Sequence, residues 1–310
     1  MKNCILSLMS GYKTSENILA FIKSINNIYT QNEVDLIVLY KDISQNVIND
    51  IKKAYPEIIL QDYSSYYEKY KIQMDLSVFH SKYIIIYYFI KNALQAKYRY
   101  ILLSDINDVF IQDDIFTHED LNEINFFAEK LNIGQCKINL KKYKSCYSHD
   151  VIKKDWNKKI INNGIILVKH ERILAYLEFY LKELLDKIPI CKTSNADQAI
   201  LTHCVHHNFT SWDDVTIHNF PNNLCLHLAQ PLEDKEFNKS INLTSNKITH
   251  KGFTPCIIHQ YNRSETLILF IYSQFKLKYN KPTIRSLLLN KLQRKLNRVK
   301  TILNQTFTKS

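Results

Sequence analysis

Hydrophobic positions in the first hundred residues follow two alternating spacings. Four short, mostly apolar runs predict strands, and the one at 36–40 is continuous, as in strands that are buried on both faces. These runs are residues 4–8, 36–40, 58–60 and 98–103. Three longer segments repeat apolar residues every three or four positions, as amphipathic helices do. They are residues 15–28, 44–55 and 75–96. The resulting β-α-β-α-β-α-β order predicts a parallel sheet with helices on both faces.

The pattern is less regular beyond residue 120. Five further apolar runs predict strands, and two periodic segments predict helices. The strands are expected at 124–128, 160–168, 215–220, 224–228 and 256–259, and the helices at 171–187 and 197–207. The chain has no internal repeat, so the pattern predicts one large α/β domain with a few strands added late in the sequence.

An acidic corner follows the strand predicted at 98–103. Asp105 and Asp108 come directly after this strand, and Asn107 adds an amide oxygen. Ligands of parallel sheets bind beyond the carboxyl ends of the strands. Carboxylate and amide oxygens suit Mg²⁺ or Mn²⁺, which usually keep open positions for substrate phosphates. The alternative interpretation is that Asp105 caps a turn and that Asp108 is solvated.

Four motifs together resemble those of GT-A glycosyltransferases, which use nucleotide-sugar donors. The run D-I-N at 105–107, followed by an apolar strand, is similar to the D-x-D motif of that family. The family's remaining motifs follow in order as N-N-G at 162–164, D-Q at 197–198 and H-Q-Y-N-R at 259–263. The resemblance covers about residues 1–265. It is strongest to bacterial enzymes of surface-polysaccharide synthesis.

This resemblance implies an α/β fold of the GT-A type, with a Rossmann-like, mostly parallel central sheet flanked by helices. It also implies a metal site for Mn²⁺ or Mg²⁺, with Asp105, Asp108 and His259 as ligands. The second acid of the family motif is Asn107 in this sequence, and Asp108 comes directly after it. Which of these two residues provides the second ligand therefore stays open, although we favour Asp108. The alternative for His259 is a histidine packed beside a strand.

The resemblance assigns further roles around the donor. Asp197 and Asn163 are candidate catalytic residues, which would contact the donor sugar or the reacting centre. The candidate residues for binding the nucleotide sugar are Ser10, Gly11, Tyr12, Lys82, Asn107, Gly164, Gln198 and Arg263. Each has an ordinary alternative. Asp197 is also a favourable acid for a helix N-terminus, and Lys82 and Arg263 are also typical of solvated surface cations.

Three histidines near the end of the helix predicted at 197–207 raise the question of a zinc site. His203 and His207 lie one helical turn apart, as in the H-E-x-x-H motif, and His206 is between them. The glutamate of that motif is missing, and the sequence identifies no third ligand. We therefore interpret this segment as a partly exposed helix end without zinc.

The last thirty residues differ in character from the rest of the chain. Residues 281–310 contain eight Lys or Arg and no acid, and their apolar residues form one stripe at helical spacing. Such a basic amphipathic helix lies on anionic bilayers. We therefore divide the chain into a catalytic domain at 1–280 and a basic amphipathic helix at 281–310. The alternative is a helix packed on the catalytic domain.

Charge and composition limit the classes of partner. The net charge is +11, but residues 281–310 account for +8 of it, which leaves residues 1–280 nearly balanced. A nearly neutral domain without a nucleic-acid motif argues against nucleic acid as a partner. With only 4 Gly in the chain, none close to another, a glycine-rich phosphate loop is excluded.

Cysteine usage and the N-terminus predict a cytoplasmic location. The 7 Cys are odd in number and form no C-x-x-C pair, which favours buried thiols in a reducing compartment. The N-terminal apolar run is too short for a signal peptide. With the basic segment at 281–310, these features predict a peripheral protein on the inner face of the membrane.

The expected function is therefore metal-dependent transfer of a sugar from a nucleotide-sugar donor, with a UDP-sugar favoured. The acceptor would be a glycan or a lipid-linked sugar, in bacterial surface-polysaccharide synthesis. Two alternatives stay open: a nucleotidyltransferase, whose sheet and metal site would have a similar sequence pattern, and a non-catalytic GT-A-like protein that binds at the membrane.

Overall fold

The computed structural model describes residues 1–12, 14–70, 72, 77–191, 193, 195–230, 234–244 and 246–279. Within this part, Met1–Leu277 forms one compact unit. The basic helix predicted at 281–310 lies outside the described residues, so the division of the chain at residue 280 stays a prediction. None of the described helices combines the length and the apolar character that crossing a bilayer requires.

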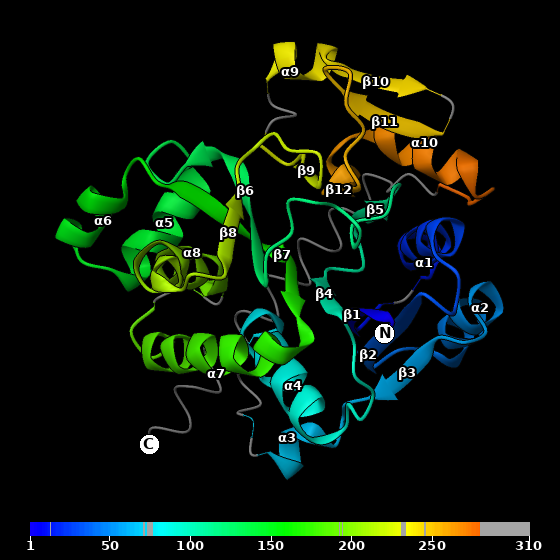
Figure 1. The fold of residues 1–310 in the computed structure, drawn as a ribbon, viewed down its shortest axis with the longest axis horizontal. Coiled ribbons are helices and arrows are strands. Elements are labelled where there is room, and N and C mark those ends of the chain that lie inside the picture. Colours follow the sequence, from blue (N-terminus) through cyan, green and yellow to red (C-terminus); the bar gives the residue numbers. More distant parts are fainter. Residues whose placement is uncertain are drawn as a thin grey trace, which may run out of the picture. The chain divides into compact units, whose positions relative to one another are not determined.

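A seven-stranded sheet forms the centre of the unit (Figure 1). Its strands are β1 (Asn3–Ser10), β2 (Val34–Lys41), β3 (Ile59–Asp62), β4 (Tyr100–Ser104), β6 (Ile124–Asn132), β7 (Lys159–Lys169) and β8 (Val215–His218). Their order is β3-β2-β1-β4-β7-β6-β8. β7 runs antiparallel to both of its neighbours, β4 and β6, and the other strand pairs are parallel. The predicted α/β fold with a mostly parallel sheet is confirmed.

Alternation of side chains along β1 and β4 explains why most residues of both strands are apolar. In β1, Leu6 faces one hydrophobic core and Ile5 faces the other. In β4, Leu103 and Leu102 divide in the same way. Successive side chains of a strand point to opposite faces, so a sheet that is covered on both sides needs a continuous apolar run.

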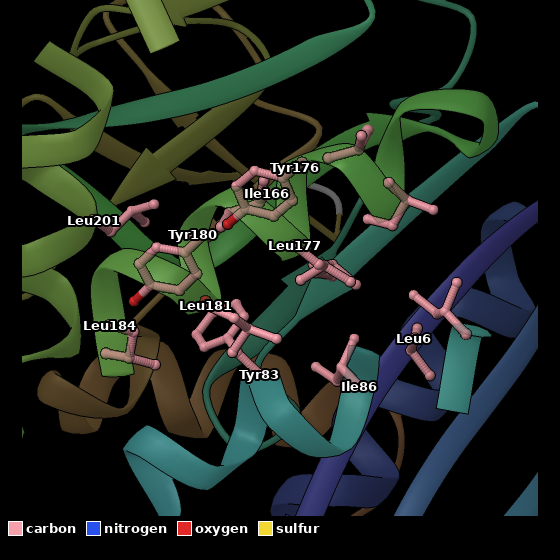
Figure 2. Packing of buried hydrophobic residues seen from close by; sticks show 14 of the residues in the cluster. Leu6, Tyr83, Ile86, Ile166, Tyr176, Leu177, Tyr180, Leu181, Leu184 and Leu201 are labelled. Carbon is pink, nitrogen blue, oxygen red and sulfur yellow. The ribbon is translucent and has the colours of Figure 1, made fainter. Parts of the chain in front are cut away.

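Helices cover both faces of this sheet. α4 (Val78–Asn92), α7 (His170–Lys187) and α8 (Asp197–His207) pack on one face, and α1 (Glu16–Ile28) and α2 (Gln45–Ala54) pack on the other. Figure 2 shows the first of these cores, where Tyr176 and Tyr180 of α7 stack with their ring centroids 6.1 Å apart. Tyr83 of α4 meets Tyr180 edge to face. These rings fix the spacing between α4, α7 and the sheet.

Two smaller sheets complete the unit. β5 (Val109–Ile111), β12 (Ile257–His259) and β9 (Cys225–His227) form one of them, in the order β5-β12-β9. β10 (Ile241–Thr244) and β11 (Lys247–His250) form an antiparallel pair. The remaining helices are α3 (Tyr66–Lys69), α5 (Lys137–Cys146), α6 (His149–Asp155), α9 (Lys235–Lys239) and α10 (Glu265–Gln274), with short 3-10 turns at Phe209–Ser211 and Tyr261–Arg263. The three-stranded sheet matters most for function, because it brings the chain near residue 259 beside the end of β4.

The predicted elements agree with the structure except at their ends, and the pattern did not predict α3, α9, β10 and β11. The helix predicted at 75–96 is shorter and runs over Val78–Asn92, where the Ser77 side chain accepts a hydrogen bond from the backbone N–H of His80 and caps its start. The predicted helices did not include α5 and α6, or α10. In α5 the apolar pattern is reversed, since Ile138 is 71% exposed while Asn139 is buried. A stripe of apolar residues therefore does not mark the buried face of α5.

The cysteines were expected to be buried thiols, and one pair of them departs from this expectation. Cys146 at the end of α5 forms a disulfide with Cys191, which precedes α8 in the chain. The remaining cysteines are free and buried, as expected: Cys4, Cys136, Cys204, Cys225 and Cys256. The disulfide fastens α5 to the segment that leads into α8.

Candidate functional site

Three segments far apart in the sequence meet at the carboxyl end of β4. Asp105 directly follows β4, Asp108 directly precedes β5, and His259 is the last residue of β12. β5 and β12 pair antiparallel with His259 opposite Val109. The backbone N–H of Gln260 donates to the carbonyl of Asp108 over 2.7 Å. Strand pairing therefore places the histidine beside both carboxylates.

We refer to Asp105, Asp108 and His259 as the cavity cluster. Nε2 of His259 lies 3.5 Å from Oδ1 of Asp108 and 3.8 Å from Oδ2 of Asp105. One ligand atom from each residue lies within 4.8 Å of the others. Nε2 is buried and has no hydrogen-bond partner among the described residues. A buried ring nitrogen that faces two carboxylates fits a divalent cation, which all three groups would coordinate.

Gly164 provides the space beside this cluster. A Cβ at this position would lie 2.5 Å from Oδ2 of Asp105 and 2.5 Å from Cε1 of His259. Its carbonyl also accepts a hydrogen bond of 2.7 Å from the backbone N–H of Asp105. Any larger residue here would push into the carboxylate and the imidazole. The close approach of β7 to the cavity cluster therefore requires glycine.

A second histidine orients the first. β9 pairs in parallel with β12 so that His227 is opposite His259. The two Nδ1 atoms are 2.9 Å apart, and both rings are buried. One Nδ1 carries the proton of this hydrogen bond, and a proton on His259 Nδ1 leaves its Nε2 lone pair directed at the carboxylates. Metal-binding histidines usually have such a partner for their other nitrogen.

Ionic contacts set the protonation of the cavity cluster. Burial raises the pKa of Asp105, but the Lys82 ammonium, 2.7 Å away, and His259 outweigh burial and hold that pKa below its usual range. Burial lowers the pKa of His259, but the charges of Asp108 and Asp105 raise it to about 9. Without a bound cation, the cluster therefore holds a protonated histidine between two carboxylates.

A cavity of about 280 Å³ opens over the cavity cluster. Nine of the predicted site residues line it: Lys82, Asp105, Asp108, Asn163, Gly164, Asp197, Gln198, His259 and Arg263. Five residues without a predicted role also line it: Phe79, Lys142, Asn195, and Asn162 and Gln260 from two of the motifs. The structure thus gathers most of the predicted site around one space.

Asp197 is held rigidly at the wall of this cavity. It is the first residue of α8, and its Oδ2 accepts a hydrogen bond of 2.5 Å from Nδ2 of Asn163. The Tyr180 hydroxyl donates to its backbone carbonyl over 3.0 Å, and the Tyr83 hydroxyl donates to the carbonyl of Asn163 over 2.8 Å. Burial raises the pKa of Asp197, although Lys142 and other cations oppose this shift. A fixed and nearly buried carboxylate suits recognition of a hydroxyl group.

Four predicted residues do not line the cavity. The amide oxygen of Asn107 accepts a hydrogen bond of 2.7 Å from Nδ2 of Asn17 in α1. Ser10 ends β1, and Gly11 follows it with a φ of 70°. Tyr12 lies near the cavity cluster, because the charges of Asp105 and Asp108 add to burial in raising its pKa to about 12. These residues lie at the same edge of the sheet as the end of β4.

A second cavity of about 310 Å³ adjoins the first and shares Lys142, Gln198, Gln260 and Arg263 with it. Glu129 of β6 is its buried centre. Oε1 of Glu129 accepts from Gln198 over 2.7 Å and from Asn162 over 2.9 Å, and Oε2 accepts from Gln230 over 2.6 Å. Burial raises the pKa of Glu129. This carboxylate therefore holds three amides that face the two cavities.

Sequence reasoning missed Glu129, His227 and Lys142. Glu129 and Lys142 carry no motif, and Lys142 belongs to a helix that the pattern did not predict. His227 had a weak signal, since C-L-H at 225–227 forms a short apolar run like the one that ends in His259. Only the pairing of the two strands makes that signal meaningful.

Solved structures with similar folds are glycosyltransferases. A structure of galactosyltransferase LgtC with donor and acceptor sugar analogs is 12% identical, with a TM-score of 0.55 over 89% of this chain and 97% of that one. An active-site mutant of LgtC is 11% identical, with a TM-score of 0.54 over 91% and 99%. The bifunctional glycosyltransferase WbbM, in its apo form, is 13% identical, with a TM-score of 0.56 over 94% of this chain and 51% of WbbM.

Comparisons with protein-family models and with curated protein sequences give no match. At identities this low, the similar structures establish the fold and leave the activity to be argued from the site. The described part of the chain has the GT-A fold of these glycosyltransferases.

Proposed function

We propose that this protein is a metal-dependent glycosyltransferase that moves a sugar from a nucleotide-sugar donor to a glycan or lipid-linked acceptor. The observation that supports this most strongly is the cavity cluster. Two carboxylates and a buried histidine nitrogen without a hydrogen-bond partner converge beside Gly164, at the carboxyl end of a strand in a GT-A fold. The similar solved structures are of glycosyltransferases, and one contains donor and acceptor sugar analogs.

Asp105, Asp108 and His259 would hold Mn²⁺ or Mg²⁺. When bound, such an ion acts as a Lewis acid that stabilises negative charge on the leaving diphosphate. Lys82 and Arg263, which line the same cavity, would contact the diphosphate as cations. His227 would keep the ring of His259 in its orientation through the hydrogen bond between the two Nδ1 atoms.

The donor sugar would lie against the end of the cavity formed by β7 and α8. Gly164 admits the sugar close to the backbone, and Asn163 and Asp197, fixed by their mutual hydrogen bond, would bind its hydroxyl groups. In the reaction, the acceptor oxygen forms a bond to the anomeric carbon, and the bond from that carbon to the diphosphate breaks. The acceptor hydroxyl releases its proton, which passes to the leaving diphosphate or to water. Asp197 would stabilise the reacting centre.

The second cavity would receive the acceptor. It shares a wall with the donor cavity through Gln198, Lys142 and Gln260, so an acceptor hydroxyl bound there would lie beside the donor sugar. Glu129 accepts hydrogen bonds from Gln198 and Gln230, and so directs both amides along this wall. Amide groups in fixed positions are suited to sugar hydroxyls, because they both donate and accept hydrogen bonds.

The nucleotide would extend from the cavity cluster toward the end of β1. Ser10 ends β1, the strand that pairs with β4, and Gly11 and Tyr12 follow it. Strand order reverses at this pair, since β2 and β3 lie on one side of β1 and β4 lies on the other. Ligands of open α/β sheets bind at such a point. Tyr12 would stack on the base, and a UDP-sugar is the favoured donor.

Residues 281–310 would bring the enzyme to an anionic membrane on its cytoplasmic face, where lipid-linked acceptors for surface-polysaccharide synthesis are extended. The charge and apolar stripe of these residues support this role. A chain that ends at residue 280 should lose its binding to vesicles containing anionic lipid. Retained binding of the shortened chain would contradict the role of the segment and would leave the proposed transfer reaction unaffected.

A thermal-shift screen of nucleotide sugars tests the proposed function directly. A nucleotide sugar that binds the native state raises the melting temperature by mass action. We expect one nucleotide class to do so with Mn²⁺ and to lose this effect with EDTA. Product analysis with that donor should show a transferred sugar and a free nucleoside diphosphate. Release of pyrophosphate would instead indicate a nucleotidyltransferase, and no shift with any donor would contradict both enzymes.

A further inference from the structure

Asp155 brings together a cluster of donors outside the cavities. It is the last residue of α6, and its side chain is fully buried. Oδ2 lies 3.2 Å from Nδ1 of His203 and accepts from the Tyr143 hydroxyl over 2.8 Å, and Oδ1 lies 2.7 Å from Nε2 of His207. The third group that the sequence did not identify beside the two histidines is therefore a carboxylate from another helix.

We propose that Asp155, His203 and His207 bind a divalent transition metal of the Zn²⁺ class. We refer to these residues as the helix cluster. One ligand atom from each lies within 4.8 Å of the others. Ligand atoms around a tetrahedral Zn²⁺ are roughly 3.4 Å apart, given metal–ligand distances of about 2.1 Å. The 3.2 Å between Oδ2 of Asp155 and Nδ1 of His203 is near that spacing, and the 2.7 Å between Oδ1 and Nε2 of His207 would open by about 0.7 Å when a metal replaces the hydrogen bond.

The ligand types select this class of metal. Two imidazoles and one carboxylate are a frequent set for Zn²⁺, whereas Mg²⁺ and Ca²⁺ prefer ligand sets made only of oxygen. The histidines sit one turn apart on α8, and their ring centroids are 4.3 Å apart, so the helix itself holds them side by side. The Tyr143 hydroxyl also bonds to Asp155 and orients the carboxylate from the third helix, α5.

In this structure the ammonium group of Lys158 lies where the metal would bind. Its ammonium nitrogen is 3.1 Å from Oδ1 of Asp155 and 3.1 Å from Nε2 of His207. Its side chain is 31% exposed, so it has a path to turn toward solvent. A divalent ion would replace this single charge, and water would complete its coordination. Lys158 therefore competes with the metal for the same two atoms.

A metal at the helix cluster would have a structural role. α8 begins with Asp197 and Gln198 at the cavity wall, and the cluster joins the other end of this helix to α6. Tyr143 joins α5 to the same point, and the disulfide between Cys146 and Cys191 fastens α5 to the segment before α8. A metal here would hold α5 and α8 in place, and so would fix the positions of Lys142, Asp197 and Gln198 at the cavity walls.

The test uses the full-length chain after treatment with EDTA and dialysis, in a background with both Asp105→Asn and Asp108→Asn. This background weakens metal binding at the cavity cluster, so that titration with Zn²⁺ against a chromophoric chelator measures the helix cluster. We expect one equivalent to bind, the melting temperature to rise by several degrees, and Co²⁺ to give the visible absorption of a tetrahedral site.

Single substitutions then separate a metal site from a network of hydrogen bonds. His203→Gln or His207→Gln should weaken Zn²⁺ binding at least 100-fold, whereas His206→Gln, on the same helix and bonded to the carbonyl of Lys159, should leave it unchanged. Lys158→Met should tighten binding about tenfold because it removes the competing charge. Absence of Zn²⁺ binding, or equal affinity in all of these variants, would overturn the proposal.

Discussion

The cavity cluster and the helix cluster contain the same two kinds of side chain but differ in how their carboxylates meet solvent. In the helix cluster, the side chain of Asp155 is fully buried and both of its oxygens have partners. In the cavity cluster, the side chains of Asp105 and Asp108 are 43% and 15% exposed and line a cavity. Only the second arrangement is open to a substrate. We therefore expect changes in the cavity cluster to alter chemistry and changes in the helix cluster to alter stability.

The largest expected effect is loss of transfer when a carboxylate of the cavity cluster is neutralised. Asp105→Asn or Asp108→Asn removes one charged ligand for the cation that would stabilise the diphosphate. Because such stabilisation is worth several kcal/mol, we expect transfer to fall by about 10³-fold. A radiolabelled donor, or coupled detection of the nucleoside diphosphate, measures this rate.

The matched substitution in the helix cluster is Asp155→Asn. It replaces a buried acceptor oxygen with an amide N–H2 group that faces the Tyr143 hydroxyl and the two histidines, and should lower the free energy of unfolding by about 3 kcal/mol. Nucleotide binding at a temperature where the variant is folded should stay within a few-fold of wild type. If Asp155→Asn abolished transfer while Asp105→Asn spared it, the assignment of the two clusters would be reversed.

Two glycines provide a second comparison. A Cβ at Gly164 would lie 2.5 Å from Oδ2 of Asp105, and a Cβ at Gly134 would lie 2.2 Å from the ring of Trp156, the residue after Asp155. Gly164→Ala should weaken metal-dependent nucleotide binding about 100-fold, because the carboxylate and His259 must both move. Gly134→Ala should lower stability by about 1 kcal/mol and leave nucleotide binding intact. Calorimetric titration of both variants with the nucleotide checks this. Similar nucleotide affinities would contradict the requirement for glycine at position 164.

The sequence predicted the cavity cluster better than the helix cluster for a physical reason. Asp105 and Asp108 follow directly after a buried strand, which is a short local pattern, and His259 was assigned through the resemblance of H-Q-Y-N-R to a family motif. Asp155 lies 48 positions before His203, on a helix whose apolar residues form no clear stripe. Nothing local links these residues, so the third member of the helix cluster depends on tertiary packing alone.

The acidic corner contains one choice that local sequence also left open. Asn107 and Asp108 both offered an oxygen. In the structure the amide oxygen of Asn107 accepts a hydrogen bond from Asn17, a contact across 90 positions, whereas Asp108 lines the cavity. Glu129 and His227 were missed for the same reason, since each acts through partners on elements far away in the sequence. The order of strands and helices in the first half was predictable, because alternating faces and helical spacing are properties of single segments.

A smaller effect is expected at Glu129, a buried carboxylate that belongs to neither cluster. Glu129→Gln keeps the shape of the side chain but turns one acceptor into a donor, so one of the three facing amides loses its partner. We expect the KM for the acceptor to rise about tenfold, with nucleotide binding within twofold of wild type. Steady-state kinetics with each substrate varied separates the two.

The control for that experiment is Glu123→Gln. Glu123 makes ion pairs with Lys169 and Arg172 at the surface, where such pairs contribute little. Its kinetic constants should match those of wild type. A rise in the KM for the donor, rather than for the acceptor, in Glu129→Gln would argue that the second cavity is not the acceptor site.

The smallest expected effect concerns a buried histidine without a facing carboxylate. Nε2 of His218 in β8 is 3.0 Å from the amide oxygen of Asn125, and its ring stacks on Phe127. Burial lowers the pKa of His218 to about 4, against the smaller opposing influence of Asp120, while His118 adds to the lowering. Near the two carboxylates of the cavity cluster, the pKa of buried His259 is instead raised to about 9. The neighbours, more than burial itself, decide the direction.

Because its pKa is lower in the folded protein, His218 takes up a proton more readily in the unfolded chain between about pH 6.5 and pH 4. Its contribution to stability is therefore complete above pH 6.5 and is lost as the pH falls through this range. Relative to His218→Gln, whose amide still donates to Asn125, wild type should lose about 1 kcal/mol between pH 7.5 and pH 5.5. Urea unfolding of both proteins across this range measures the difference. Parallel pH profiles would mean that burial without a facing carboxylate does not lower the pKa of His218 in this fold.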